Sequence, residues 1–187
     1  MKKIKIVLYL LSFSMVNMVT AQKYFTKGAM VSFYSSSPLE KIEGVTKSAN
    51  CVVDQATGAV EMAVLIKSLI FAKALMQEHF NENYMESNTY PKATFKGVIT
   101  NFADVKLNTI GTYPAMLKGN ITIHGVTKPL ETTATIKSDG IKVGVTTEFN
   151  LTVADYNISI PSVVKDNIAK VVKVSIKADL EEFKKAQ

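Results

Sequence analysis

The sequence of 187 residues contains no tryptophan, one cysteine and two histidines, and each shortage limits what the protein can be. The lone cysteine, Cys51, excludes an intramolecular disulfide, and its place beside two valines predicts a small buried hydrophobic residue. The two histidines, His79 and His124, lie far from each other and from Cys51 in the sequence, so there is no metal-ligand cluster of recognisable spacing. No nucleophile elbow, H-E-x-x-H motif or phosphate-binding glycine loop occurs either. These absences favour a binding protein without a cofactor over an enzyme.

Charge is also unevenly placed along the chain. The formal net charge is +6, but Lys2, Lys3 and Lys5 lie in a first segment that has no acidic residue, and without them the charge is +3. The other lysines are spread along the chain without a patch in which basic and aromatic residues alternate. Binding to nucleic acid is therefore not expected.

Residues 1–21 have the features of a secretory signal peptide. The three lysines form a basic start, residues 6–19 form an apolar stretch, and Ala21 is a small residue before the expected cleavage site at Gln22. The apolar stretch is short for a transmembrane anchor and is followed at once by polar residues. We expect an exported protein, periplasmic or secreted, in which residues 22–187 form a single domain.

The most regular part of the chain is residues 117–136. Apolar and polar residues alternate on both sides of a break at His124-Gly125, and this period of two is typical of strands with one buried face. Gly125 can adopt the positive φ that a tight connection needs. The stretch predicts two antiparallel strands joined by a short turn.

Three motifs resemble those of the YceI-like family. G-N-I-T-I-H-G-V-T-K-P at residues 119–129 resembles the family's G-x-L-T-I-x-G-V-T-[KR]-P segment, and residues 88–96 resemble its K-Y-P-x-A-T-F segment. Residues 149–158 resemble F-x-x-x-R-x-D-[FY]-x-I, although Val153-Ala154 stands where many relatives carry an arginine. The resemblance covers nearly all of the chain after residue 21. It implies an extended, lipocalin-like antiparallel barrel that binds long apolar molecules such as polyisoprenoids.

The rest of the sequence agrees with a mainly all-β fold. Alternating stretches predict further strands at residues 25–36, 39–47, 51–54, 60–67, 93–99, 141–151 and 172–180, with a bulge or bend at Gly44. Residues 71–85 change to helical spacing and predict the one convincing helix, which either plugs the barrel end or covers a ligand. We therefore predict an extended antiparallel eight-stranded lipocalin-like β-barrel with one or two short helices near its mouth.

The size of the inward residues indicates whether such a barrel is filled or hollow. Several are small: Ser35, Ala93, Gly97, Gly119, Thr132, Ala134 and Ala178. The space they leave would suit a long hydrocarbon, since polar groups there would lack hydrogen-bond partners. The predicted ligand-binding residues are Phe33, Phe71, Leu75, Phe80, Tyr84, Phe95, Phe102, Ile121, Phe149 and Tyr156.

Two hypotheses follow for the function. The first is a protein that sequesters or carries a polyisoprenoid, an isoprenoid quinone or another lipid, with transient membrane contact and a homodimer both compatible with the resemblance. The second is an exported hydrolase or isomerase that acts on a lipid in the same cavity, using His79 or His124 with Asp155. An outer-membrane barrel is disfavoured, because the outward faces carry Lys and Glu at mid-strand, where a lipid-facing band would be apolar.

Overall fold

The computed structural model describes residues 22–183. Most of these residues are in strands, as the alternation of apolar and polar residues predicts. The predicted signal peptide at 1–21 lies outside these residues. The strands are β1 (Lys23–Ser36), β2 (Lys41–Asp54), β3 (Ala59–Leu65), β4 (Ile70–Phe71), β5 (Lys92–Ile99), β6 (Gly111–Ile123), β7 (Val126–Ser138), β8 (Lys142–Thr152) and β9 (Val171–Glu182). The helical segments are η1 (Ile66–Ser68), α1 (Ala74–His79), η2 (Phe80–Tyr84), η3 (Phe102–Asp104), η4 (Val153–Tyr156) and η5 (Ser162–Val164).

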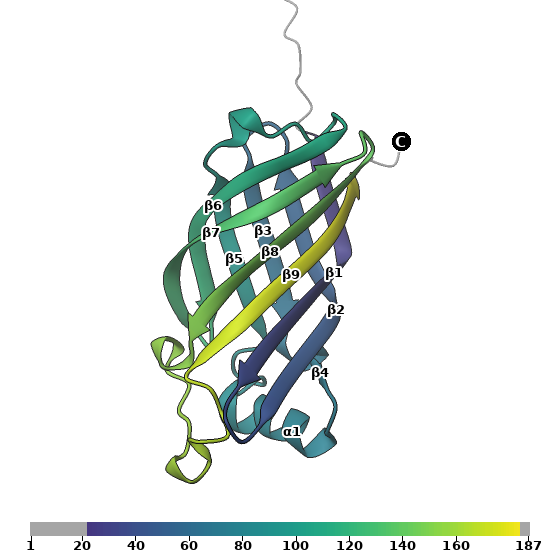
Figure 1. The fold of residues 1–187 in the computed structure, drawn as a ribbon. Helices are drawn as coiled ribbons and strands as arrows, with labels where there is room; N and C mark the ends of the chain where they lie inside the picture. Colours follow the sequence, from purple (N-terminus) through teal and green to yellow (C-terminus); the bar gives the residue numbers. More distant parts are fainter. Residues whose placement is uncertain (1–21, 184–187) are drawn as a thin grey trace, which may run out of the picture.

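These strands form one antiparallel sheet that closes on itself (Figure 1). The sheet order is β1-β9-β8-β7-β6-β5-β3-β2-β4, and β1 also pairs with β2. This last pairing makes a closed cycle of eight strands, while the two-residue β4 adds to the edge of β2 through Gly44 and Val45. The predicted eight-stranded antiparallel barrel with short helices is confirmed.

Tight turns hold the strand register, and the turn between β6 and β7 lies where the sequence predicts it. Ile123 pairs with Val126, so β6 and β7 are joined by the two residues His124 and Gly125, and Gly125 has φ +73°. His124 also has a positive φ, of 49°. Positive φ at both residues of a two-residue turn matches the twist of the strands that it joins. Between β7 and β8, the Asp139 carboxylate accepts hydrogen bonds from two backbone N–H groups at the start of β8, which lower the pKa of Asp139.

The two ends of the barrel are built differently. Large side chains fill the end that carries the β7–β8 turn, where Tyr24, Leu107, Ile136 and Leu180 are almost fully buried. The Ser138 hydroxyl donates to the Leu107 carbonyl at 2.6 Å and ties the loop before β6 to this core. In Figure 1, α1 and the chain between β8 and β9 lie at the opposite end. We call the first end the filled end and the second the mouth.

The helix predicted at 71–85 is shorter than expected. It begins at Ala74, because Phe71 is in β4, where its backbone pairs with Gly44 and its N–H donates to the Gln77 side chain at 3.2 Å. From Phe80 to Tyr84 the helix widens to a π-helix. Leu75, although it fits the helical spacing of the apolar residues, is 62% exposed.

Two strands predicted at 39–47 and 51–54 form the single strand β2, and the predicted bulge at Gly44 is wrong. Gly44 stands in the regular ladder opposite Phe33 and Phe71, and a Cβ there would lie 2.6 Å from one of these rings and 2.8 Å from the other. The irregular register between β1 and β2 occurs farther along, around Ala29. Gly44 is thus required because aromatic rings pack over its backbone.

No helix among residues 22–183 has both the length and the apolar character needed to cross a membrane.

The paired glycines Gly97 and Gly119 lie on the inner face where β5 and β6 approach closely. A Cβ at Gly119 would collide with the Lys96 carbonyl and would lie 2.5 Å from the Gly97 Cα, both of which are backbone atoms that cannot rotate away. We expect Gly119→Ala to lower the free energy of unfolding by about 2 kcal/mol, measured by urea denaturation.

Gly144→Ala in β8 is the matched control. Its new methyl group would meet no atom closer than 3.6 Å. A strand glycine is also entropically unfavourable, so this variant should be neutral or more stable by up to about 1 kcal/mol. Equal losses of stability in both variants would contradict the close approach of β5 and β6.

Candidate ligand site at the mouth of the barrel

The inward side chains do not fill the half of the barrel nearest the mouth. They leave a cavity of about 390 Å³, within the range of small-molecule sites in proteins. All eight strands of the closed barrel contribute to its wall, and α1, η2, η4 and η5 close it toward the mouth. Alternation along each strand explains this arrangement, because every second residue faces the interior.

The wall is almost entirely apolar, and several of its few hydroxyl groups already have backbone partners. Ser35 Oγ accepts a hydrogen bond from the Ala169 N–H at 2.9 Å. Thr147 donates to the Thr133 carbonyl at 2.7 Å, and Thr132 donates to the Glu148 carbonyl at 3.4 Å. These groups are therefore engaged within the protein, and the interior offers little hydrogen bonding to a ligand.

Three aromatic rings from β1, β4 and η2 meet near the mouth. Phe33 stacks on Phe80 with ring centroids 5.2 Å apart, and Phe71 lies 5.6 Å from Phe33 and 4.8 Å from Phe80. Gly44 leaves room for two of these rings, as described above. The cluster is a rigid apolar part of the wall, since each ring restricts the other two.

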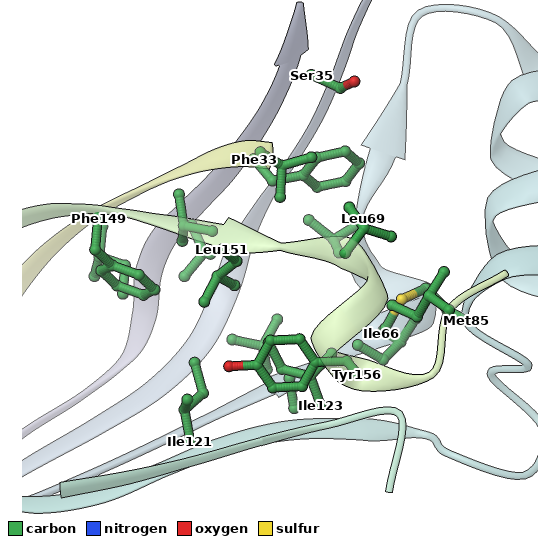
Figure 2. Close-up of a pocket in the computed structure, with 18 of the residues that line it drawn as sticks. Phe33, Ser35, Ile66, Leu69, Met85, Ile121, Ile123, Phe149, Leu151 and Tyr156 are labelled. Carbon is green, nitrogen blue, oxygen red and sulfur yellow. The ribbon is translucent and has the colours of Figure 1, made fainter. Parts of the chain in front are cut away.

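Tyr156 lies opposite this cluster, and Figure 2 shows its ring projecting from η4 into the space between Ile123 and Leu151. The residue is only 4% exposed. Burial, with a smaller contribution from the Asp155 carboxylate, raises the pKa of the Tyr156 phenol above its ordinary value. Burial also raises the pKa of Tyr84 on η2. Both phenols are neutral at physiological pH and place a hydroxyl in otherwise apolar surroundings.

The structure brings together most of the residues predicted to bind a ligand. The cavity wall includes Phe33, Phe71, Phe80, Tyr84, Phe95, Ile121, Phe149 and Tyr156. Leu75 is outside it, since its side chain faces solvent on α1. Phe102 is also outside it, because it packs against Gly58 near the filled end, where a Cβ on Gly58 would lie 2.6 Å from the ring.

The small inward residues have two different roles. Ser35, Ala93, Thr132 and Ala178 line the cavity as the sequence predicts. Gly97, Gly119 and Ala134 do not line it, and the two glycines instead allow two strands to approach closely. The small inward residues thus predicted the cavity correctly at four positions. At Gly97 and Gly119 the small size serves the close packing of two strands.

Sequence reasoning missed a group of wall residues in the long connection after β8 and around α1. These residues are Leu69, Met76, Met85, Ile158, Ile160, Val164 and Ile168. The isolated apolar residues of the connection were a usable signal, because a loop fully exposed to water has little reason to carry them.

A shallow polar hollow adjoins the mouth. It is lined by residues 37–41 with Lys73 and Asn167, and it shares Glu40 and Asn167 with the cavity wall. The Lys73 ammonium donates to the Glu40 carboxylate at 3.2 Å. Polar groups are thus present at the edge of the cavity and nearly absent from its interior.

The structure does not assemble the residues of the enzyme hypothesis. His79 Nδ1 lies 3.0 Å from the Asn83 side-chain amide, and His124 contacts Tyr156 and Glu86. Within residues 22–183, neither histidine pairs with Asp155, and no three His, Cys, Asp or Glu side chains gather to hold a metal ion.

Comparison with known families accounts for most of the chain. A model described as the YceI-like domain matches residues 24–180. No curated protein matches the chain.

Three solved structures share the fold at low sequence identity. A polyisoprenoid binding domain from Saccharophagus degradans, implicated in plant cell wall breakdown, has a TM-score of 0.74 and 15% identity, covering 86% of this chain and 98% of its own. Burkholderia cenocepacia BcnA has a TM-score of 0.65 and 19% identity, covering 81% and 95%. The Campylobacter jejuni YCEI protein has a TM-score of 0.56 and 19% identity, covering 76% and 85%.

Cys51 reports on the interior of the cavity. Its side chain lines the wall and is 5% exposed, and burial raises the pKa of the thiol to about 11. Because only the thiolate reacts, we expect Ellman's reagent at pH 8 to modify the native protein roughly a hundredfold more slowly than the chain unfolded in guanidinium chloride. The rate should rise with pH as the thiolate forms.

The matched control moves the thiol by one residue, to the outer face of β2, in a Cys51→Ser, Asn50→Cys double variant. Asn50 is exposed, so this thiol should react at nearly the unfolded rate. Fast modification of Cys51 in the native protein would show that it is not enclosed.

Proposed function

This chain belongs to the YceI-like domain family, and on that premise we propose that it is a binding protein that encloses a long apolar ligand in its barrel. The ligand is a polyisoprenoid, an isoprenoid quinone or another lipid. The family match and the polyisoprenoid binding domain of the same fold support this class of ligand. The protein sequesters or carries the ligand by reversible burial, without a covalent step.

The observation that carries the proposal is an almost entirely apolar cavity in which three of the few hydroxyl groups are bonded to the backbone. Ser35, Thr132 and Thr147 are bonded to the backbone, so a polar ligand would replace few of the hydrogen bonds that it makes to water. A hydrocarbon chain gains roughly 25 cal/mol for each Å² of apolar surface removed from water. The cavity therefore favours ligands that have a long apolar chain.

Any polar end of the ligand would lie at the mouth. The adjoining hollow has polar groups from Ser37, Lys41, Asn167 and the Glu40–Lys73 pair, and both members of the pair keep contact with solvent. A neutral polar group such as a quinone ring or an alcohol fits there without burying a charge. We further propose that the protein is exported after cleavage before Gln22 and acts in the periplasm or outside the cell.

The first test is native mass spectrometry of the full-length gene product expressed with export in a Gram-negative host. We expect a polypeptide beginning at Gln22 with a discrete added mass that organic solvent extracts as a polyprenol, quinone or fatty derivative. The same spectrum gives the oligomeric state and so tests a homodimer. A mass without ligand that persists after incubation with such lipids would contradict the binding function.

A cavity-filling variant connects the bound mass to this site. Ala93 faces the cavity from β5, and Ala93→Phe would occupy part of its volume, so the share of protein that retains ligand should fall severalfold. Lys96→Phe on the outer face of the same strand adds the same side chain and loses only an exposed ion pair with Glu61 at 3.8 Å. This control should retain ligand as the wild type does.

The mouth also has the features of a membrane-contacting surface. Leu39, Ile70, Leu75 and Val163 are each more than half exposed, and they come from four separate segments at this end of the barrel. Lysines at positions 41, 67, 73 and 165 lie two or three residues from them. Apolar side chains flanked by lysines insert at a lipid surface while the ammonium groups stay among the headgroups. We propose that the mouth touches the membrane transiently when ligand is exchanged.

A Leu39→Gln, Leu75→Gln double variant should bind vesicles of phosphatidylethanolamine and phosphatidylglycerol several times more weakly than the wild type in a flotation assay. Ile110 and Ile141 are equally exposed near the filled end, so Ile110→Gln, Ile141→Gln is the matched control and should bind normally. Equal weakening in both variants would show that contact with vesicles is not made by the mouth.

A further inference from the structure

Three segments that are distant in sequence meet around the imidazole of His124 at one side of the mouth. Nδ1 lies 3.0 Å from the Tyr156 carbonyl oxygen on η4. Nε2 lies 3.3 Å from Oε2 of Glu86, just after η2. The Tyr90 ring packs edge-on against the imidazole at 4.5 Å between centroids. The His124 side chain is 10% exposed, so this histidine is a nearly buried junction of three chain segments.

The backbone is strained on all three segments at this place. Among the residues that the structure describes, the non-glycine residues with positive φ are Glu86 at 41°, His124 at 49° and Asn157 at 56°. One belongs to each segment, and Asn157 directly follows Tyr156. Such conformations persist where the surroundings hold them, and they concentrate at functional sites.

The neighbours of the imidazole are both hydrogen-bond acceptors. The Tyr156 carbonyl needs a donor at Nδ1, and the Glu86 carboxylate needs a donor at Nε2. A neutral imidazole has one N–H group, whereas an imidazolium has two. Nε2 is buried without a hydrogen bond although the carboxylate oxygen is 3.3 Å away. Protonation would turn this unpaired atom into a donor that faces a carboxylate.

His124 is also the sole polar link between η4 and its neighbours at this side. Within residues 22–183, no other hydrogen bond joins η4 to the β6–β7 turn or to the segment after η2. Tyr156, whose carbonyl His124 holds, forms part of the cavity wall. A change at the imidazole therefore acts directly on the wall.

We infer that His124 is a positioning residue for the ligand cavity, which it keeps closed by holding η4 and the Tyr156 ring in place. This inference rests on the proposed function, since it concerns how the cavity retains a ligand. The protonated imidazole donates to the Tyr156 carbonyl and to Glu86 and closes the wall. The neutral form has one donor for two acceptors, so we expect η4 to be held less firmly and ligand to leave faster at pH 8 than at pH 5.5.

Other charged or titratable groups on the elements around the imidazole must be considered. They are Glu86 and Tyr90 after η2, Tyr84 on η2, Asp155 and Tyr156 on η4, and Lys128 on β7. Carboxylates titrate below this pH range, and phenols and ammonium groups titrate above it. The competing group is His79, which lines the cavity from α1.

The first test needs no ligand. Hydrogen exchange of the backbone amides in residues 153–157, corrected for the intrinsic effect of pH, is measured at pH 5.5 and 8 for the full chain. Wild-type protection should fall roughly tenfold at the higher pH, the factor expected for loss of one charge-assisted hydrogen bond. His124→Asn should be weakly protected at both values. Asn-Gly is a favoured two-residue hairpin turn, so this variant should keep its fold.

The second test follows the release of the apolar dye N-phenyl-1-naphthylamine into vesicles of phosphatidylcholine by stopped flow. Wild type and His79→Gln should release it faster at pH 8 than at pH 5.5, and His124→Asn should release it quickly at both. Glu86→Gln should release it slowly at both, because its amide can donate to the neutral imidazole. The same pH profile in wild type and His124→Asn, or its loss in His79→Gln, would overturn the inference.

The two tests separate the inference from the proposed function. Failure of every variant to bind the dye or any extracted lipid would contradict the binding function. A pH-dependent protection of η4 that requires His124 would still stand as a property of the chain. Protection of η4 that is unaffected by His124→Asn would overturn the role of His124 whatever the protein binds.

Discussion

Closure of the sheet is the constraint on which the other features depend. Because β1 pairs with both β2 and β9, the eight strands form a closed cycle. The pairing between β7 and β8 is partial, since only residues 134–138 and 143–147 face each other in register. Only side chains then face the interior. Eight strands enclose a space that side chains can just fill or that can hold one small ligand. At each position along the barrel axis, the size of the inward side chains decides which outcome occurs.

The same alternation gives both outcomes in this barrel. At the filled end, Tyr24, Ile136 and Leu180 leave no room, and the nearby glycine pair of β5 and β6 brings two strands together. Toward the mouth, Ala93 and Ala178 leave space, and the wall hydroxyl groups of Ser35 and Thr147 are bonded to the backbone. The apolar character of the cavity thus comes from how its polar groups are bonded as well as from its hydrocarbon side chains.

Features that depend on neighbours in sequence could be predicted from the residue pattern, and the closed barrel from the family resemblance. Individual contacts between distant residues could not be predicted. Alternation predicted the strands, and Gly125 predicted the tight turn between β6 and β7. The predicted helix start is wrong because Phe71 pairs with Gly44. Phe102 is predicted to bind the ligand because its contact with Gly58 is not visible in a linear pattern. The meeting of His124 with Glu86 depends on how a turn, a helix end and a loop are placed in space, so no local pattern indicates it.

The separation of the two ends has a consequence for ligand exchange. The filled end has its own buried side chains, among them Tyr24, Leu107 and Leu180, so we expect the barrel to stay folded when the cavity is empty. At the mouth, η4 is tied to the rest of the chain by few hydrogen bonds, chiefly from His124 to the Tyr156 carbonyl and from the Val153 N–H to the Lys170 carbonyl at 2.9 Å. Segments with few such contacts open at low free-energy cost while the core stays folded. On the proposed function, we therefore expect a ligand to enter and leave through a local opening of the mouth, without separation of the barrel strands.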